Sequence, residues 1–317
     1  MRQKLYTYLA IKPFCIALLL LHFGLSNLQA QTKESSRYTT NTINESVMSI
    51  SDRSYITVTE GFGNLDTRLL FEANIAPTYF IRFGKNSKLG MSISPHVLIR
   101  MTREESFPIL TPSYMPNVIL YWRFRSPLSN LTEKNGVKKV ISPRHITFLT
   151  LKLNHHSNGQ SGDFFLPGTR EVNFEDGNFS TNFMELGLNT ANFNPDANTK
   201  FIVHAKAAFE RHFDFDREKS MREIYYWQSF NGELRFTINK FLSAAFLFKH
   251  MTGIGAFKPQ QSYDAWISFR LGNYSDFSLF ARYYHGPDYY NLRYVNNISQ
   301  ITFGLLAEPL NLPIFRR

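Results

Sequence analysis

Apolar and polar residues alternate along many short segments of this chain. Between residues 145 and 157, Leu149, Leu151 and Leu153 alternate with polar residues such as Lys152. Side chains two positions apart lie on the same face of a β-strand, so this segment has one apolar and one polar face. The same alternation recurs in the segments 201–210 and 276–284. The pattern therefore predicts a structure built from β-strands.

Twelve such strands are predicted along the chain. They span residues 54–61, 72–82, 89–101, 113–124, 145–157, 181–191, 200–212, 224–238, 241–251, 262–272, 276–284 and 297–308. Most approach or exceed the about 9–11 residues that a strand needs to cross a bilayer. An even number of strands of this length predicts an all-β fold, a 12-stranded antiparallel transmembrane β-barrel of the outer membrane.

The connections between these strands alternate in length. Short turns rich in Gly, Asn and Pro are expected at 84–87, 194–196, 238–240 and 272–275. Longer loops are expected at 102–112, 158–180, 213–223, 252–261 and 285–296. Short turns at one end and long loops at the other are typical of outer-membrane barrels. The connection at 125–144, which contains Asn135-Gly136, is an exception because it is long for the short-turn end.

The first thirty residues have the layout of a secretory signal peptide. Basic residues precede an apolar run at 14–25, and a polar segment follows that ends at Ala30. The alternative is a membrane anchor, but the apolar run is shorter than the ~20 residues of a spanning helix. We therefore expect residues 1–30 to be cleaved during export, and residues 31–317 to form a single β-barrel domain with a short N-terminal extension.

The composition agrees with a membrane barrel. The chain has 30 Phe, 16 Tyr and 3 Trp, so that aromatic residues make up 15% of it. Membrane barrels carry aromatic girdles, where we expect Trp122, Trp227 and Trp266. The net charge of +10 suits an anionic membrane surface, and without a dense Lys/Arg cluster no nucleic-acid partner is expected. The only cysteine, Cys15, lies in the predicted signal peptide, which excludes thiol chemistry in the mature chain.

A polar stretch at 154–159 ends the fifth predicted strand. His155 and Ser157 continue the row of Leu153, so both are predicted to face outward, where polar groups are costly and indicate a function. A serine beside an imidazole is the pattern of a nucleophile with its general base. On the next predicted strand, Asn182 lies in phase with outward apolar residues. Antiparallel pairing of the two strands would bring its amide beside the imidazole and orient that ring.

Two other interpretations of this stretch exist. A lone His-x-Ser on a strand is more often structural than catalytic, and it is the following Asn158-Gly159, the barrel context and the outward Asn182 together that favour catalysis here. His155 and His156 are adjacent and could form a metal-binding pair, but neighbouring residues of a strand face opposite ways.

These residues resemble a known family. The sequence Asn-His-His-Ser-Asn-Gly-Gln-Ser at 154–161 resembles the Asn-His-x-Ser-Asn-Gly-Arg-Ser signature of outer membrane phospholipase A. The resemblance implies His155 as general base, Ser157 as nucleophile and Asn182 as the residue that orients the base. It covers roughly residues 70–307 at low identity. It implies a calcium-dependent phospholipase that hydrolyses acyl esters of phospholipids, with A1/A2 and lysophospholipase activity.

The resemblance also implies a Ca²⁺ cofactor beside the serine. Its carbonyl ligands would fall on Ser106 and Gln160, and its side-chain ligand on Asn178, where the family has a serine. Calcium prefers oxygen ligands, which all three residues offer. Alternative side-chain ligands in the same loop are Asp163, Glu175 and Asp176. This acidic loop can equally be read as a solvated surface loop.

The family forms dimers, so a homodimer is an expected assembly. A lipid-embedded glutamine on the third strand of the family helps to hold the dimer, and Ser94, beside Pro95, stands in its place here.

Two functions from different classes remain open at this level. The first is an outer-membrane enzyme that cleaves phospholipids. The second is a non-enzymatic outer-membrane barrel, either a pore or an inactive relative, and the lumen distinguishes the two. Inward side chains that would plug a twelve-stranded barrel include Lys152, His156, Lys206 and Arg282.

Overall fold

The computed structural model describes most of the chain after residue 50. The described residues are 51–57, 62–65, 69–83, 87–106, 108–124, 131–134, 137–140, 145–192, 202–237, 241–255, 257–272 and 277–307. The predicted signal peptide at 1–30 lies outside them, as do Asn135-Gly136 and most residues of the four predicted short turns.

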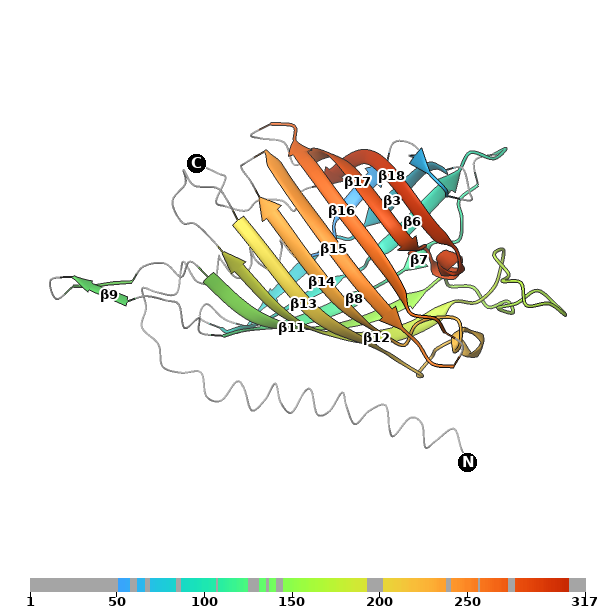
Figure 1. Ribbon diagram of the computed structural model, residues 1–317, viewed down its shortest axis with the longest axis horizontal. Helices are drawn as coiled ribbons and strands as arrows, with labels where there is room; N and C mark the ends of the chain where they lie inside the picture. Colours follow the sequence, from blue (N-terminus) through green and yellow to red (C-terminus); the bar gives the residue numbers. More distant parts are fainter. Residues whose placement is uncertain are drawn as a thin grey trace, which may run out of the picture.

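Twelve antiparallel strands close into a barrel, as the sequence predicts (Figure 1). Eight of them are continuous: β11 (His145–Ser157), β12 (Ser180–Asn192), β13 (Ile202–Phe213), β14 (Gln228–Thr237), β15 (Leu242–Thr252), β16 (Gln260–Arg270), β17 (Phe277–Pro287) and β18 (Asn297–Ala307). These strands have 10–13 residues, which is enough to cross a bilayer. The pairing of β11 with β12 closes the ring.

The first four wall strands are each divided into two pieces. The pairs of pieces are β1 (Ser54–Thr57) with β2 (Phe62–Gly63), β3 (Leu69–Ile75) with β4 (Tyr79–Arg82), β5 (Leu89–Ser94) with β6 (Val97–Thr102), and β7 (Ser113–Tyr114) with β8 (Asn117–Arg123). Pro77, Pro95 and Pro116 lie in three of the gaps. Proline has no N–H to donate to a neighbouring strand, so it interrupts a hydrogen-bonded ladder. The sequence predicted these four strands as continuous.

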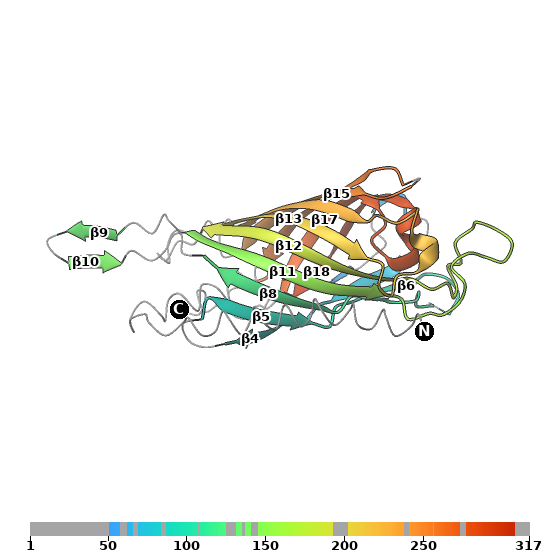
Figure 2. The ribbon, with the colours of Figure 1, turned by 90° about the horizontal axis from the view of Figure 1, so that it is seen from below.

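The long connection at 125–144 contains a separate hairpin. Strands β9 (Leu131–Lys134) and β10 (Val137–Val140) pair only with each other. The hairpin projects from the end of the barrel opposite to the loop at 158–180 (Figure 2). The described chain also has two short 3₁₀ turns, η1 (Lys219–Met221) and η2 (Asn291–Val295). None of its helices is long and apolar enough to cross a membrane.

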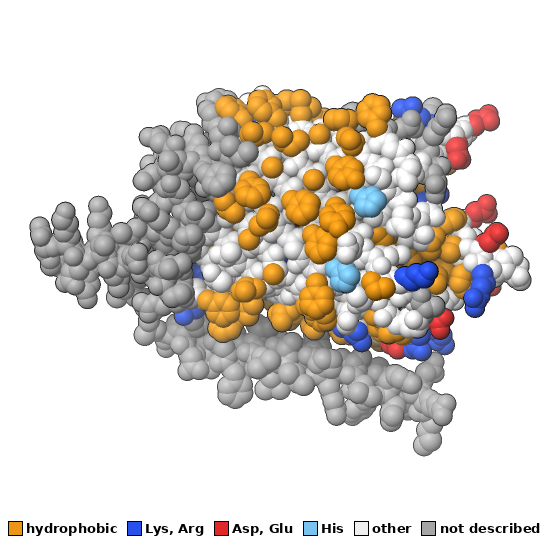
Figure 3. All heavy atoms as spheres, viewed as in Figure 1, with side chains coloured by type: hydrophobic (Ala, Val, Ile, Leu, Met, Phe, Trp, Pro, Cys, Tyr) orange, Lys and Arg blue, Asp and Glu red, His pale blue; other side chains and the backbone are white. Residues whose placement is uncertain are grey.

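Large apolar side chains cover the outside of the barrel wall (Figure 3). Leu186 and Leu188 on β12, and Ile267 and Phe269 on β16, are each 51–52% exposed. Between them lie buried polar residues such as Ser268. Apolar side chains that face outward and polar ones that face inward are the pattern of a barrel whose outer surface contacts lipid.

The lumen is filled largely by paired charges. The cavity that remains has a volume of about 430 Å³. Its lining holds six acidic side chains and six Lys or Arg side chains, namely Asp52, Glu185, Glu210, Glu233, Asp264 and Asp288 against Arg53, Lys152, Lys206, Arg235, Lys249 and Arg282. Lys206 bonds Glu185 at 2.5 Å, and Arg282 bonds Asp264 at 2.9 Å. The residues expected to point inward, His156 among them, do line this cavity.

Two of the three tryptophans lie elsewhere than predicted. Trp122 is 47% exposed on the outer surface, as expected for a girdle. Trp266 instead faces the lumen, with the Arg282 guanidinium 4.7 Å from its ring centroid. Trp227 lies in a loop and is buried against Arg217. In both cases a cation stacked on the ring explains why an aromatic residue occupies a buried polar region.

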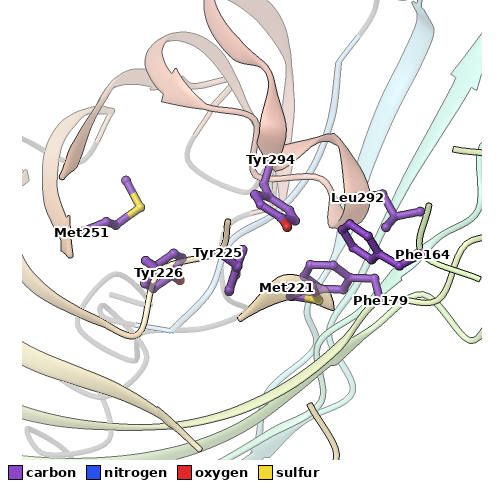
Figure 4. Packing of buried hydrophobic residues seen from close by; sticks show 8 residues of the cluster. All are labelled: Phe164, Phe179, Met221, Tyr225, Tyr226, Met251, Leu292 and Tyr294. Atoms are coloured by element: carbon purple, nitrogen blue, oxygen red, sulfur yellow. The ribbon is translucent and has the colours of Figure 1, made fainter. Parts of the chain in front are cut away.

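Loops close over one end of the barrel through a hydrophobic cluster (Figure 4). The cluster consists of Phe164, Phe179, Met221, Tyr225, Tyr226, Met251, Leu292 and Tyr294. It joins the loop at 158–180 with the connections that precede β14 and β18. This loop cap lies at the end of the barrel where β11 ends and β12 begins, so it supports the residues at that edge.

Candidate functional site

His155 and Asn182 meet on the outer surface of the barrel. The register of β11 and β12 places them directly opposite each other. His155 Nδ1 lies 2.9 Å from Asn182 Oδ1. Both side chains are partly exposed, and they share the outward row of Leu153 and Leu186. The contact expected from strand periodicity is therefore present.

A second hydrogen bond fixes which way the Asn182 amide points. Its Nδ2 donates to the backbone carbonyl of Phe215 at 2.9 Å. Because only the amide nitrogen can donate to a carbonyl, the amide oxygen must face His155. That oxygen accepts a hydrogen bond, so the proton of the neutral imidazole lies on Nδ1. The Nε2 atom of His155 is then left with a lone pair that can accept a proton.

Ser157 lies two residues beyond His155 on the same face of β11. It is partly exposed, and its strand partners are Ser180 on one side and Tyr114 on the other. The strand ends at Ser157, and two residues later Gly159 has φ of 71°. This left-handed conformation turns the chain away from the wall and favours glycine. Ser157 therefore lies at the rim, partly exposed on the same face of β11 as His155. Among the described residues, no hydrogen bond joins its hydroxyl to the imidazole, whose side-chain partner is Asn182.

The residues that alternate with this pair face inward and brace the turn. Asn158 is buried, and its Nδ2 donates to the Gly177 carbonyl at 2.8 Å. Its Oδ1 accepts from the backbone N–H of Phe179 at 3.0 Å. The buried ring of His156 packs on Phe179, with 4.6 Å between the ring centroids. As predicted, His156 faces the lumen, on the opposite side of β11 from His155.

The three residues proposed as calcium ligands come from two loops. Gln160 and Asn178 lie at opposite ends of one loop, where the backbone N–H of Asn178 donates to Gly162 at 2.9 Å. Ser106 lies in the other loop, with φ of 68°. No contact joins Ser106 to Gln160 or Asn178 in the part of the chain that the structure describes. The structure thus brings two of the three residues to one loop base.

The oxygen atoms that these residues offer are of the kind that binds calcium. Within the described residues, neither the Ser106 carbonyl nor the Gln160 carbonyl accepts a hydrogen bond. A hard cation such as Ca²⁺ takes oxygen ligands of this kind. No group of three or more His, Cys, Asp and Glu residues in the described ranges is arranged to hold a metal. The atoms offered at these three positions are carbonyl and amide oxygens rather than carboxylates.

The loop that follows β13 makes two contributions to the site that were not predicted from the sequence. The Phe215 carbonyl holds the Asn182 amide, and Glu218 Oε2 accepts from Asn178 Nδ2 at 3.1 Å. The only feature of the sequence that marks this loop is that acidic residues occupy every second position, at Asp214, Asp216 and Glu218. A backbone carbonyl has no sequence signature, so this contact is visible only in the folded chain.

The whole barrel was compared with known proteins. No protein-family model and no curated protein sequence matches the chain. Among solved structures, outer membrane phospholipase A from Escherichia coli aligns with a TM-score of 0.52 and 14% identity, over 82% of this chain and 91% of that chain. The barrel is similar in fold to outer membrane phospholipase A. At 14% identity the similarity shows the fold alone.

Two further structures give the same result. An active-site mutant of the Escherichia coli outer membrane phospholipase A aligns with a TM-score of 0.53 and 12% identity, over 88% of this chain and 100% of that chain. The outer membrane phospholipase of Salmonella typhi, a dimer with bound calcium, aligns with a TM-score of 0.52 and 14% identity. That alignment covers 81% of this chain and 90% of that chain.

One residue comparison with outer membrane phospholipase A is wrong. Ser94 was compared with a glutamine that faces lipid, but its side chain is only 4% exposed and faces inward beside the outward Ile93. The break at Pro95 follows it directly. Ser94 therefore does not stand at a lipid-facing dimer position.

Proposed function

We propose that this protein is an outer-membrane phospholipase that hydrolyses acyl esters of phospholipids through Ser157, His155 and Asn182. The observation that carries the proposal is the hydrogen bond of 2.9 Å between His155 Nδ1 and Asn182 Oδ1 on the outward face of the barrel. In a buried polar core such a hydrogen bond would have a purely structural explanation. On a surface that faces lipid, two polar side chains are costly, so their presence indicates a function.

The residues support acyl transfer in two steps. Ser157 Oγ attacks the ester carbonyl, and His155 Nε2 takes its proton and passes it to the leaving alcohol. Water then attacks the acyl-enzyme, with the same nitrogen as general base. Asn182 orients the imidazole throughout and stabilises the imidazolium that forms. A neutral amide does this without placing an anion at the lipid boundary.

Calcium is part of the proposal as a cofactor. Ser106, Gln160 and Asn178 would hold the ion, and Glu218 supplies a negative charge next to Asn178. When bound there, the ion supplies positive charge that favours the oxyanion of the transition state. The protein residues themselves bind the ester, position the serine and move its proton.

The proposed location is the outer membrane, reached through a cleaved signal peptide. The exposed apolar wall supports contact with lipid. The site opens on this wall, so phospholipids of the surrounding membrane are its proposed substrates. A homodimer is also proposed, since a similar barrel, that of Salmonella typhi, is a dimer.

The alternative function is a pore, and the lumen argues against it. The equal numbers of acidic and basic side chains around the cavity are largely bonded to one another, as in the pair of Lys206 and Glu185. Ion selectivity in pores usually comes from rings of one charge. Reconstitution in a planar bilayer should therefore show no steady conductance, and a stable open channel would favour the pore.

The direct test is fatty-acid release from phospholipid by the purified, refolded barrel, with calcium and then with excess chelator. Release that chelator abolishes is expected for the wild type, and none for Ser157→Ala. Thr190→Ala, on the same outward face of β12 but far from the site, is the control and should keep full activity. Equal release by Ser157→Ala and the wild type would rule out the proposed nucleophile.

A further inference from the structure

The loop between β13 and β14 folds onto the start of β12. The Phe215 carbonyl accepts from Asn182 Nδ2 at 2.9 Å, and the Asp216 carbonyl accepts from Ser180 Oγ at 2.8 Å. The backbone N–H of Glu218 donates to the Ser180 carbonyl at 3.0 Å. Three contacts therefore tie residues 215, 216 and 218 to Ser180 and Asn182 at the start of β12. A shift of this loop would change the orientation of the Asn182 amide.

The conformation of this loop needs an anchor. Asp216 has φ of 52°, in a left-handed region that costs energy for residues other than glycine. The side chains of Phe215 and Asp216 are exposed and do not pack into the barrel. The loop therefore has no buried hydrophobic side chain of its own at the position that contacts Asn182.

Arg217 is the buried residue at the centre of this loop. Its side chain is 7% exposed, although it follows two exposed residues. Nη2 donates to the carbonyls of Tyr225 at 3.1 Å and Tyr226 at 3.2 Å. The guanidinium carbon lies 4.3 Å from the ring centroid of Trp227. These three residues end the same connection, immediately before β14, so Arg217 ties the start of the loop to the segment that leads into the barrel wall.

The Arg217 guanidinium is held by backbone carbonyls and aromatic rings rather than by an ion pair at the surface. Burial lowers the pKa of Arg217, and in the described part of the chain no carboxylate bonds its guanidinium. Its Nε and Nη1 are buried, without an acceptor among the described residues. The aromatic faces and the two carbonyls therefore offset much of the cost of burying this cation.

We propose that Arg217 is a positioning residue of the site: it holds the loop so that the Phe215 carbonyl keeps the Asn182 oxygen turned toward His155. The inference rests on the proposed function, because the geometry matters only if His155 acts as a base. Arg217 itself lies behind the loop and does not touch the outward serine. Its effect on the reaction passes entirely through Asn182.

A double-mutant cycle tests this route. Arg217→Gln should lower kcat by about tenfold, a size typical of coupled neighbours, and leave KM nearly unchanged. In an Asn182→Ala background the same change should have no further effect. Arg217→Lys, which keeps a charge over the Trp227 ring, should restore part of the activity. Arg222→Gln is the control, because Arg222 pairs with Asp214 on the exposed surface and should leave kcat unchanged.

A milder variant covers the case in which Arg217→Gln does not fold. Ser180→Ala removes the bond to the Asp216 carbonyl and leaves Arg217 in place. Ser180→Ala should lower kcat by less than Arg217→Gln does. In an Asn182→Ala background it should have no further effect. An equal loss in both backgrounds, for either variant, would overturn the inference.

A second readout needs no activity. NMR of the barrel with ¹⁵N-labelled histidine, assigned with His155→Gln, reports which ring nitrogen of His155 carries the proton. We expect the Nδ1–H form in the wild type and a mixture of forms in Arg217→Gln. An unchanged tautomer in Arg217→Gln would refute the positioning role. If the tautomer shifts but the wild type releases no fatty acid, the positioning role of Arg217 stands and the proposed function fails.

Discussion

The orienting role of Asn182 allows a quantitative prediction. Asn182→Ala removes the 2.9 Å bond to His155 Nδ1 and leaves the imidazole free to rotate and change tautomer. In the transition state this ring is positively charged, and a hydrogen bond to a charged group is worth about 1.5–3 kcal/mol. Since about 1.4 kcal/mol corresponds to a factor of ten in rate, kcat should fall about 10- to 150-fold. KM should change little, because the amide does not bind substrate.

A substitution that keeps a hydrogen-bond acceptor at position 182 tests whether the amide N–H is also needed to orient His155. Asn182→Asp retains an oxygen toward His155 but replaces the amide N–H that Phe215 accepts with a second oxygen. Two oxygens would then face each other, so we expect Asn182→Asp to recover only part of the activity lost in Asn182→Ala. The assay is single-turnover release of a labelled acyl chain from mixed micelles. Full wild-type kcat in Asn182→Ala, with the fold intact, would refute the orienting role.

Three further predictions concern stability and the site turn. In the wild type Arg100 bonds Asp288 at 2.7 Å, and Arg100→Met would leave this carboxylate as an unpaired buried anion. The free energy of unfolding, measured by urea titration in micelles, should therefore fall by about 3–5 kcal/mol. Leu186→Lys should destabilise the barrel by about 2–4 kcal/mol in bilayers, and no loss would contradict a lipid-facing wall. In Gly159→Ala the new methyl group makes only ordinary contact with Tyr114, but the alanine must adopt φ of 71°. The substitution should therefore lower the free energy of unfolding by about 1–2 kcal/mol and lower kcat several-fold. Unchanged kinetics would show that this turn does not position Ser157.

The strand pattern was readable because it repeats every two residues and needs no knowledge of distant contacts. Its main error lies between residues 224 and 227, which were assigned to a strand. Tyr225 and Tyr226 instead form part of the loop cap, and the rings of Tyr225 and Trp227 pack against Arg217. Aromatic residues favour strands and buried caps alike, and only the tertiary partner decides between them.

Alternation separates two faces of a strand but does not say what each face must contain. In β16 the inward row holds Asp264, Trp266 and Ser268 together. Trp266 was expected in the outer girdle, because membrane barrels carry aromatic residues there. The lumen here is packed with paired cations, and Arg282 stacks on Trp266. A narrow barrel that is filled rather than open therefore accepts aromatic residues on its inner face.

The geometry of the site follows from the same pattern that directs the wall toward lipid. Thirteen residue pairs join β11 to β12, and their outward apolar residues fix the register, because a slip of one residue would turn one row inward. At that register His155 must meet Asn182, and this contact was predictable. The Phe215 carbonyl was not, because it depends on a loop conformation held by Arg217 from the far side. The membrane-facing pattern thus brings the two side chains together, and the loop determines which atom of the amide faces the imidazole.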